Sequence, residues 1–176
     1  MSENEENEPS RRARLPDGIL VRSVRLSDAE ELTDLMNLPG YRAGTLRPPY
    51  QRVEEVRKNM ENPSAGALNL VVTLDGKIVG NCGLNRLGGR RQHVASVGMG
   101  VHDDFTGRGF GRILLGAMVE AADDWLDVKR LELTVYTDNH AIRLRAGRSA
   151  EGLRFSIGRV CRRLYHGEAE TLSEPG

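Results

Sequence analysis

The feature that most constrains this chain is a glycine-rich turn between an apolar strand and an apolar helix. Residues 97–125 read VGMGVHDDFTGRGFGRILLGAMVEAADDW. Gly107, Gly109 and Gly111 surround Arg108, and apolar residues then recur at helical spacing. Glycines allow a positive φ and leave no side chain between backbone amides and a ligand. Because the first N–H groups of a helix are free and lie at its positive end, this turn predicts a phosphate-binding site.

Two other phosphate-binding motifs can be compared with this turn. A P-loop ends in Gly-Lys-Ser/Thr, but here Gly111 is followed by Arg112. A dinucleotide fingerprint needs an acidic residue after the next strand, and Asp138 follows the expected strand at 131–136, so spacing leaves this alternative open. A turn before a core helix, with no ligand, is the third alternative, because Gly-x-Gly-x-Gly alone is a weak signal.

The wider block from Val97 to Leu144 resembles the acyl-CoA-binding core of the GCN5-related N-acetyltransferases, the GNAT family. The turn of that family carries Gln/Arg-x-x-Gly-x-Gly/Ala. Here Thr106 stands in the first position, and Gly109 and Gly111 fit the rest. The segment Asp138–Leu144 resembles the family's downstream Asn-x-x-Ala stretch. The resemblance spans about residues 18–144, and segments 90–95, 123–126 and 131–135 look closest to bacterial members that acetylate free amino acids.

The resemblance implies an α/β (α+β) fold, in which helices flank a twisted, mixed and mostly antiparallel sheet. Two central strands would splay apart to hold acetyl-CoA as co-substrate. Main-chain groups of Met99, Gly100 and Val101 would pair with the pantetheine arm. The other residues implied to bind the cofactor are Thr106, Gly107, Arg108, Gly109, Phe110, Gly111, Arg112 and Asn139.

The loop expected at 41–50, YRAGTLRPPY, would lie beside the acceptor pocket in this family. Pro48-Pro49 should keep it extended and stiff. Thr45, Leu46 and Arg47 are the candidates for shaping the pocket, and Arg47 could pair with a substrate carboxylate. A purely structural connection is an equal alternative.

Acetylation requires the amine to lose a proton before it attacks the thioester. His93 is one candidate for the base, since imidazole titrates near neutral pH. Glu132 is another, because it alternates with the apolar Leu131 and Leu133 on an expected strand. For both residues, a surface position without a catalytic role is the alternative. Direct attack needs no covalent enzyme intermediate, so a Ser or Cys triad is not expected.

The end of the chain departs from the family. After Leu144 the family usually places a tyrosine that protonates the departing CoA thiolate, but Arg145 stands here. Residues 144–176 diverge, and the segment after Phe155 shows poor strand alternation. A neighbouring reading frame across residues 158–169 could encode a tail of the family type, so we hypothesise a frameshift, which the nucleotide sequence tests.

These features leave several functions open. The first is N-acetylation of a primary amine of a small molecule, such as a free amino acid. An acyl-CoA-binding protein with impaired catalysis is the second, and Arg145 and the divergent tail favour it. A protein or peptide N-acetyltransferase, or a nucleotide-binding regulatory domain based on the turn alone, are the others.

Length and composition limit the number of domains, the partners and the cellular location that we expect for this chain. The length of 176 residues suits one domain, expected at 17–176 after a disordered tail at 1–16. The 25 basic and 25 acidic residues balance, which argues against nucleic-acid or membrane-surface partners. With no apolar run of membrane-spanning length and no hydrophobic leader, a cytoplasmic location is expected. Cys82 and Cys161 lack the spacing of metal ligands, so no metal is expected. The resemblance to the family suggests a homodimer.

Local patterns predict the elements that surround the turn. Ser27 and Glu30 have the spacing of a capping box, and Pro39-Gly40 should end the helix that follows. Asp75-Gly76 should form a tight hairpin. The expected strands are 19–26, 67–74, 77–84, 93–101 and 131–136, and the expected helices begin at Ser27, Arg52 and Gly109.

Overall fold

The computed structural model describes residues 15–45, 47–136 and 154–160 of the chain. Its strands are β1 (Ile19–Ser23), β2 (Leu68–Leu74), β3 (Lys77–Arg86), β4 (Val94–Val101), β5 (Arg130–Tyr136) and β6 (Arg154–Val160). Its helices are α1 (Ala29–Asn37), α2 (Pro39–Gly44), α3 (Val53–Glu61) and α4 (Phe110–Asp124), with short 3-10 turns η1 (Leu26–Asp28), η2 (Gly89–Arg91) and η3 (Asp103–Phe105).

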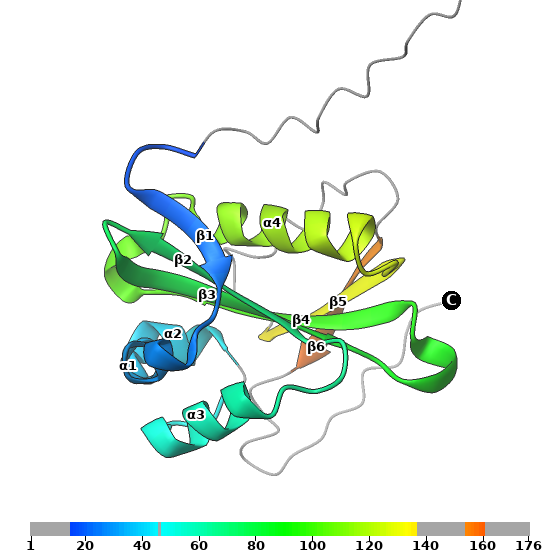
Figure 1. Ribbon diagram of the computed structural model, residues 1–176, viewed down its shortest axis with the longest axis horizontal. Coiled ribbons are helices and arrows are strands. Elements are labelled where there is room, and N and C mark those ends of the chain that lie inside the picture. Colours follow the sequence, from blue (N-terminus) through cyan, green and yellow to red (C-terminus); the bar gives the residue numbers. More distant parts are fainter. Residues whose placement is uncertain (1–14, 46, 137–153, 161–176) are drawn as a thin grey trace, which may run out of the picture.

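The strands form one sheet in the order in which they occur along the chain. The pairs from β1 to β4 are antiparallel, whereas β4 with β5 and β5 with β6 are parallel. Helix α4 lies on one side of this sheet and α1, α2 and α3 lie on the other (Figure 1). The expected fold class, a mixed and mostly antiparallel sheet flanked by helices, is therefore confirmed.

Each face of the sheet carries its own apolar cluster, because alternate residues of a strand point to opposite faces. On one face, Leu114 and Met118 of α4 pack among strand residues such as Leu84 and Leu131. On the other, α1 and Tyr41 of α2 cover Val71 of β2 and Ile78 of β3. The buried residues of α1 include Leu32, Leu35 and Met36, as the sequence predicts.

The hairpin between β2 and β3 confirms the predicted turn. Asp75 and Gly76 have φ values of 49° and 86°, which a two-residue hairpin turn of this hand requires. The register shifts beyond the turn, so that Val79 of β3 has no opposing residue on β2. The carbonyl of Val79 instead accepts a 2.9 Å hydrogen bond from the N–H of His102, which directly follows β4. This bulge fastens the end of β4 to β3.

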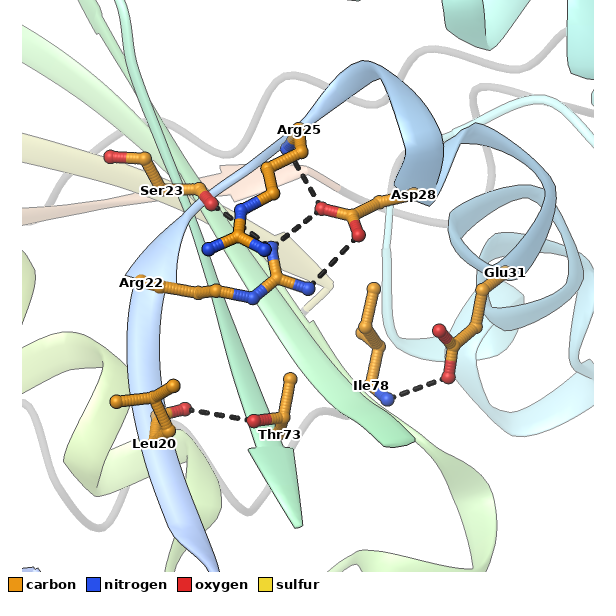
Figure 2. Close-up of polar contacts among 8 residues, drawn as sticks. All are labelled: Leu20, Arg22, Ser23, Arg25, Asp28, Glu31, Thr73 and Ile78. Carbon is orange, nitrogen blue, oxygen red and sulfur yellow. Dashed lines mark hydrogen bonds and ion pairs between the residues drawn. The ribbon is translucent and has the colours of Figure 1, made fainter. Parts of the chain in front are cut away.

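The predicted capping box of Ser27 and Glu30 is wrong, because the box is formed by Arg25 and Asp28 at the start of η1. The carboxylate of Asp28 accepts 2.7 Å and 2.9 Å hydrogen bonds from Arg22 and a 2.7 Å bond from the N–H of Arg25 (Figure 2). The hydrogen bond from Arg22 holds the pKa of Asp28 below its ordinary value. Glu31 then accepts a 2.6 Å bond from the N–H of Ile78, which ties α1 to β3 (Figure 2).

The predicted loop at 41–50 is wrong in its first part, because α2 extends to Gly44. Pro39 does end α1, as predicted, but it also occupies the first turn of the next helix, where a missing N–H has no cost. Leu38 keeps the extended conformation expected before proline. Strand β6 differs from expectation too, since its backbone pairs with β5 where the side-chain pattern predicts no strand.

Candidate active site

The two central parallel strands separate partway along their length. Strand β4 pairs with β3 throughout, but its pairing with β5 covers only Val94–Val97. Beyond that point β5 continues to Tyr136 beside β6. Among the described residues, 98–101 therefore have no strand on the β5 side. Every second N–H and C=O of such an edge is free to pair with an extended ligand.

The two glycines on this open segment, Gly98 and Gly100, have different surroundings. A Cβ at Gly98 would meet nothing within 4 Å. A Cβ at Gly100 would overlap the aromatic ring of Tyr41. The absence of a side chain at Gly100 thus allows an aromatic ring from α2 to lie against the backbone of β4.

The glycine-rich turn takes the conformation that the sequence suggests. Gly107 and Gly109 have φ values of 76° and 93°, and a Cβ on either would meet nothing within 4 Å. Gly109 directly precedes α4, a helix of 15 residues. Gly111 serves packing instead, because its Cβ position lies 3.4 Å from Cε of Met99. The open glycine positions leave room for a ligand beside the first N–H groups of α4.

Side chains around this turn are held in place. The guanidinium of Arg108 lies over the rings of Phe105 and Phe110, 5.0 Å and 5.7 Å from their centroids. The hydroxyl of Thr106 donates a 3.0 Å hydrogen bond to the carbonyl of Asp103, closing η3. Arg112 is exposed on the first turn of α4. Two arginines therefore flank the turn where an anion would bind.

A carboxylate connects this turn to α2. Asp103 accepts 2.7 Å hydrogen bonds from the N–H groups of both Gly40 and Tyr41. These are N–H groups of the first turn of α2, which lack partners within the helix. The contact places the glycine-rich turn and α2 in a fixed relationship.

Tyr41 is buried between α2 and the sheet. Its hydroxyl donates a 2.8 Å hydrogen bond to Oδ1 of Asn81, which lies opposite Gly100 in the β3–β4 register. Burial raises the pKa of Tyr41, and the positive charge of Arg47 and the hydrogen bond with Asn81 oppose that rise.

Two polar atoms near the end of α2 have no partner. Nε of Arg42 and Oγ1 of Thr45 are both inaccessible to solvent and make no hydrogen bond with the described part of the chain. The guanidinium of Arg42 lies over the exposed ring of Tyr50, 5.5 Å from its centroid. Of the predicted acceptor residues, Thr45 directly follows α2, Arg47 is exposed, and Leu46 lies outside the described residues.

The two candidate bases lie at different distances from the open segment. His93 is exposed and precedes Gly100 by seven positions, or ~23 Å along an extended strand. Glu132 pairs with Ser96, two positions before the segment opens, and it lies on the sheet face away from α4. Its carboxylate binds Arg91 at 3.0 Å and Arg130 at 3.2 Å. Glu132 is therefore nearer the opening but is engaged in ion pairs.

Local sequence reasoning missed Tyr41, Asn81 and Asp103 as site residues. Each acts through a partner at least 40 positions away in the sequence, so no local spacing identifies them. The predicted residues Asn139 and Arg145 lie outside the described residues.

Comparison with known proteins identifies the family. The model of the acetyltransferase (GNAT) family matches residues 30–144, more than half of the chain. The L-amino acid N-acetyltransferase AaaT of Escherichia coli (strain K12) is 31% identical over 122 residues, which cover 69% of this chain and 75% of the relative. The chain belongs to the GNAT family of acetyltransferases, as the glycine-rich turn and its surroundings predicted.

Solved structures agree with this assignment. A GNAT-family acetyltransferase from Streptococcus pneumoniae matches with a TM-score of 0.62 and 25% identity, over 72% of this chain and 79% of that one. A ribosomal-protein-alanine N-acetyltransferase from Brucella melitensis matches with a TM-score of 0.63 and 24% identity, over 71% and 79%. The YncA structure from Salmonella typhimurium, a putative acetyltransferase with acetyl-CoA, shares the fold at a TM-score of 0.52 and 18% identity, over 61% and 65%.

Among the described residues, no group of three or more His, Cys, Asp or Glu side chains could hold a metal ion. Within the same residues, no helix is long and apolar enough to cross a membrane.

Proposed function

We propose that this protein transfers the acetyl group of acetyl-CoA to the primary amine of a small molecule, and that the acceptor is a free amino acid. The observation that carries the proposal is the edge of β4 at 98–101, which pairs with no strand of the described residues on the β5 side, beside the positive-φ turn Gly107–Gly109. A cofactor with a polyamide arm and a pyrophosphate needs these two features together. The name of the E. coli relative supports the choice of acceptor.

The cofactor contacts follow from this arrangement. Backbone N–H groups at Gly109–Gly111 bind the pyrophosphate, with Arg108 and Arg112 adding positive charge. The edge at Met99–Val101 pairs with the amides of the pantetheine arm. Thr106, Phe110 and Asn139 complete the proposed set, with Thr106 and Phe110 shaping the turn.

The chemistry requires a base, an oxyanion donor and a proton for the leaving group. Glu132 accepts the ammonium proton through a water molecule, and its position nearer the open edge favours it over His93. The amine nitrogen then attacks the thioester carbon, and a main-chain N–H of β4 stabilises the oxyanion. The C–S bond then breaks, the nitrogen loses its second proton to water, and the thiolate takes a proton from water, since Arg145 stands where the family places tyrosine.

A second function is favoured by that same substitution. Without the tyrosine, the chain could bind acyl-CoA and turn it over slowly. A peptide or protein amine as acceptor is the remaining alternative. In each case the cofactor site is the same and only the later steps differ.

The test separates binding from turnover. Calorimetric titration should show binding of CoA and no competing effect of NAD. Mass spectrometry of reactions with acetyl-CoA should then reveal N-acetylated products from a panel of amino acids, simple amines and peptides. Binding of CoA without any product would support the impaired binder, and absence of CoA binding would overturn the proposal.

A further inference from the structure

We propose that Lys77 and Arg108 bind the 3′-phosphate of CoA, and that this contact lets the protein distinguish CoA from dephospho-CoA. The inference rests on the proposed function, which places the pyrophosphate of the cofactor at the glycine-rich turn. It adds Lys77, a residue outside that turn, to the cofactor site, and it assigns a particular phosphate to Arg108.

The two cations meet at one aromatic ring. Nζ of Lys77 lies 5.8 Å, and Cζ of Arg108 lies 5.0 Å, from the centroid of the Phe105 ring. That ring makes edge-to-face contacts with His102 and Phe110, with centroids 5.2 Å and 6.0 Å away. Because a cation is attracted to the face of an aromatic ring, Phe105 holds both side chains beside the glycine-rich turn.

The arrangement of the strands explains how Lys77 reaches the turn. Lys77 is the first residue of β3, which runs antiparallel to β4. The N–H of His102 donates a 2.9 Å hydrogen bond to the carbonyl of Val79, so the start of β3 lies beside the end of β4. Phe105 belongs to η3, which follows β4 closely. Two cations from different elements are thereby brought together.

Both positive charges are accessible and lack an acidic partner. Lys77 and Arg108 are exposed, and neither forms an ion pair with a carboxylate of the described residues. The two carboxylates of η3 contact other groups, since Asp103 binds N–H groups of α2 and Asp104 lies 3.9 Å from Nδ1 of His102. An anion can therefore bind the two cations without displacing an existing partner.

The chemistry of CoA connects this pair of cations with the turn. The 3′-phosphate and the 5′-pyrophosphate are attached to the same ribose, so the groups that bind them must lie close together. Arg108 stands between Gly107 and Gly109, where a Cβ would meet nothing within 4 Å. A phosphate monoester carries about −1.5 to −2 charge at neutral pH, which an ammonium and a guanidinium together can balance.

The test compares two ligands that differ only in this phosphate. CoA and dephospho-CoA are titrated calorimetrically into the wild-type protein and into each variant. The wild-type protein should bind CoA more tightly, and Lys77→Gln and Arg108→Gln should each lower the ratio of the two dissociation constants by about threefold, as expected for exposed charge pairs. The wild-type ratio should also fall with rising salt, because salt screens exposed charges.

A matched control is available on the opposite side of the sheet. Lys58 is exposed on α3, which lies across the sheet from α4 (Figure 1). Lys58→Gln removes the same charge as Lys77→Gln and should keep the wild-type ratio. The assignment is overturned if the wild-type protein binds both ligands equally, if Lys77→Gln keeps the wild-type ratio, or if Lys58→Gln lowers it as much.

Arg112 provides a comparison within the cofactor site. Since Arg112 is proposed to add charge at the pyrophosphate, which both ligands contain, Arg112→Gln should weaken the binding of both equally. A ratio that falls in Arg112→Gln and not in Lys77→Gln would place the 3′-phosphate elsewhere and overturn the inference.

The same titrations separate this inference from the proposed function. A ratio that depends on Lys77 supports the phosphate site even if no amine is acetylated. Acetyl transfer by a protein that binds CoA and dephospho-CoA equally leaves the proposed function intact and refutes the phosphate site. Binding of neither ligand refutes both.

Discussion

The carboxylate of Asp103 accepts a 2.7 Å hydrogen bond from the backbone N–H of Tyr41, although 62 positions separate them in the sequence. A second 2.7 Å bond from Gly40 completes the contact. One residue thereby joins the turn proposed to bind pyrophosphate to the segment expected beside the acceptor pocket.

This link predicts that Asp103→Ala impairs the use of the amine more than the use of acetyl-CoA. The change removes the acceptor for two N–H groups at the start of α2, and loss of such a cap costs about 1 kcal/mol of stability. We expect kcat/KM for the amine to fall several-fold more than kcat/KM for acetyl-CoA, because α2 shifts while the turn remains. Steady-state kinetics with each substrate varied checks this. Equal losses for both substrates would contradict a specific link to α2.

The contact between Gly100 and Tyr41 predicts that Gly100→Ala is destabilising. Overpacking of a buried contact costs about 1–3 kcal/mol, and here the added methyl would overlap the Tyr41 ring. Urea denaturation measures the effect. Gly98→Ala is the control, since its methyl would meet nothing within 4 Å, and its free energy of unfolding should match that of the wild type.

The glycine-rich turn predicts different effects for two substitutions to alanine. Gly109 has a φ of 93°, where a side chain costs about 1–2 kcal/mol. Relief of that strain would rotate N–H groups away from the ligand, so Gly109→Ala should weaken CoA binding about tenfold, as 1.4 kcal/mol implies. Gly116 lies exposed inside α4 with open space around it, and Gly116→Ala should leave the CoA affinity unchanged while stabilising the fold by about 0.5–1 kcal/mol. Calorimetry and thermal denaturation test both variants.

The ion pair of Asp28 and Arg22 predicts a pH-dependent contribution to stability. The folded protein holds the pKa of Asp28 below the ordinary value of 3.8. The stabilisation is therefore present above that value and disappears as the pH falls through the lower, folded-state pKa. Arg22→Ala should lower the free energy of unfolding by about 1.5–3 kcal/mol at neutral pH, the range for hydrogen bonds to charged groups. A deficit that stays constant down to the acid limit of folding would contradict this account.

If Glu132 is the base, substitution of Glu132 should lower kcat far more than substitution of its ion-pair partner Arg91. Glu132→Gln should lower kcat by about 10²-fold or more, as expected for loss of general base catalysis. Arg91→Gln breaks a contact of the same carboxylate and leaves the carboxylate in place, so kcat should change only a few-fold. If both variants lose activity equally, Glu132 acts through the ion pair, and His93→Gln becomes the next variant to measure.

Periodicity and turn chemistry allowed much of this fold to be predicted from the sequence. The hairpin at Asp75-Gly76 and the apolar face of α1 depend on neighbouring residues, which a local pattern contains. The glycine-rich turn was recognisable for the same reason, since its glycines are close in sequence and share one conformational requirement. The pattern did not distinguish the packing role of Gly111 from the positive φ of Gly107 and Gly109.

The features that could not be predicted depend on partners far away in the chain. Glu31 illustrates this, because its carboxylate accepts a hydrogen bond from the N–H of Ile78, 47 positions away. Pro39 resembles a helix stop, yet the carboxylate of Asp103 stabilises a second helix that starts there. The same holds for Tyr41, which is buried only because Gly100 leaves space beneath β4.

The most direct test of the central claim is release of free thiol from acetyl-CoA when L-methionine is added. The account predicts thiol release that requires both substrates, equals the amount of N-acetyl-L-methionine formed, and falls strongly in Glu132→Gln. Tight binding of CoA with no thiol release, across methionine and the other amino acids, would contradict the claim that this protein is an amino-acid acetyltransferase.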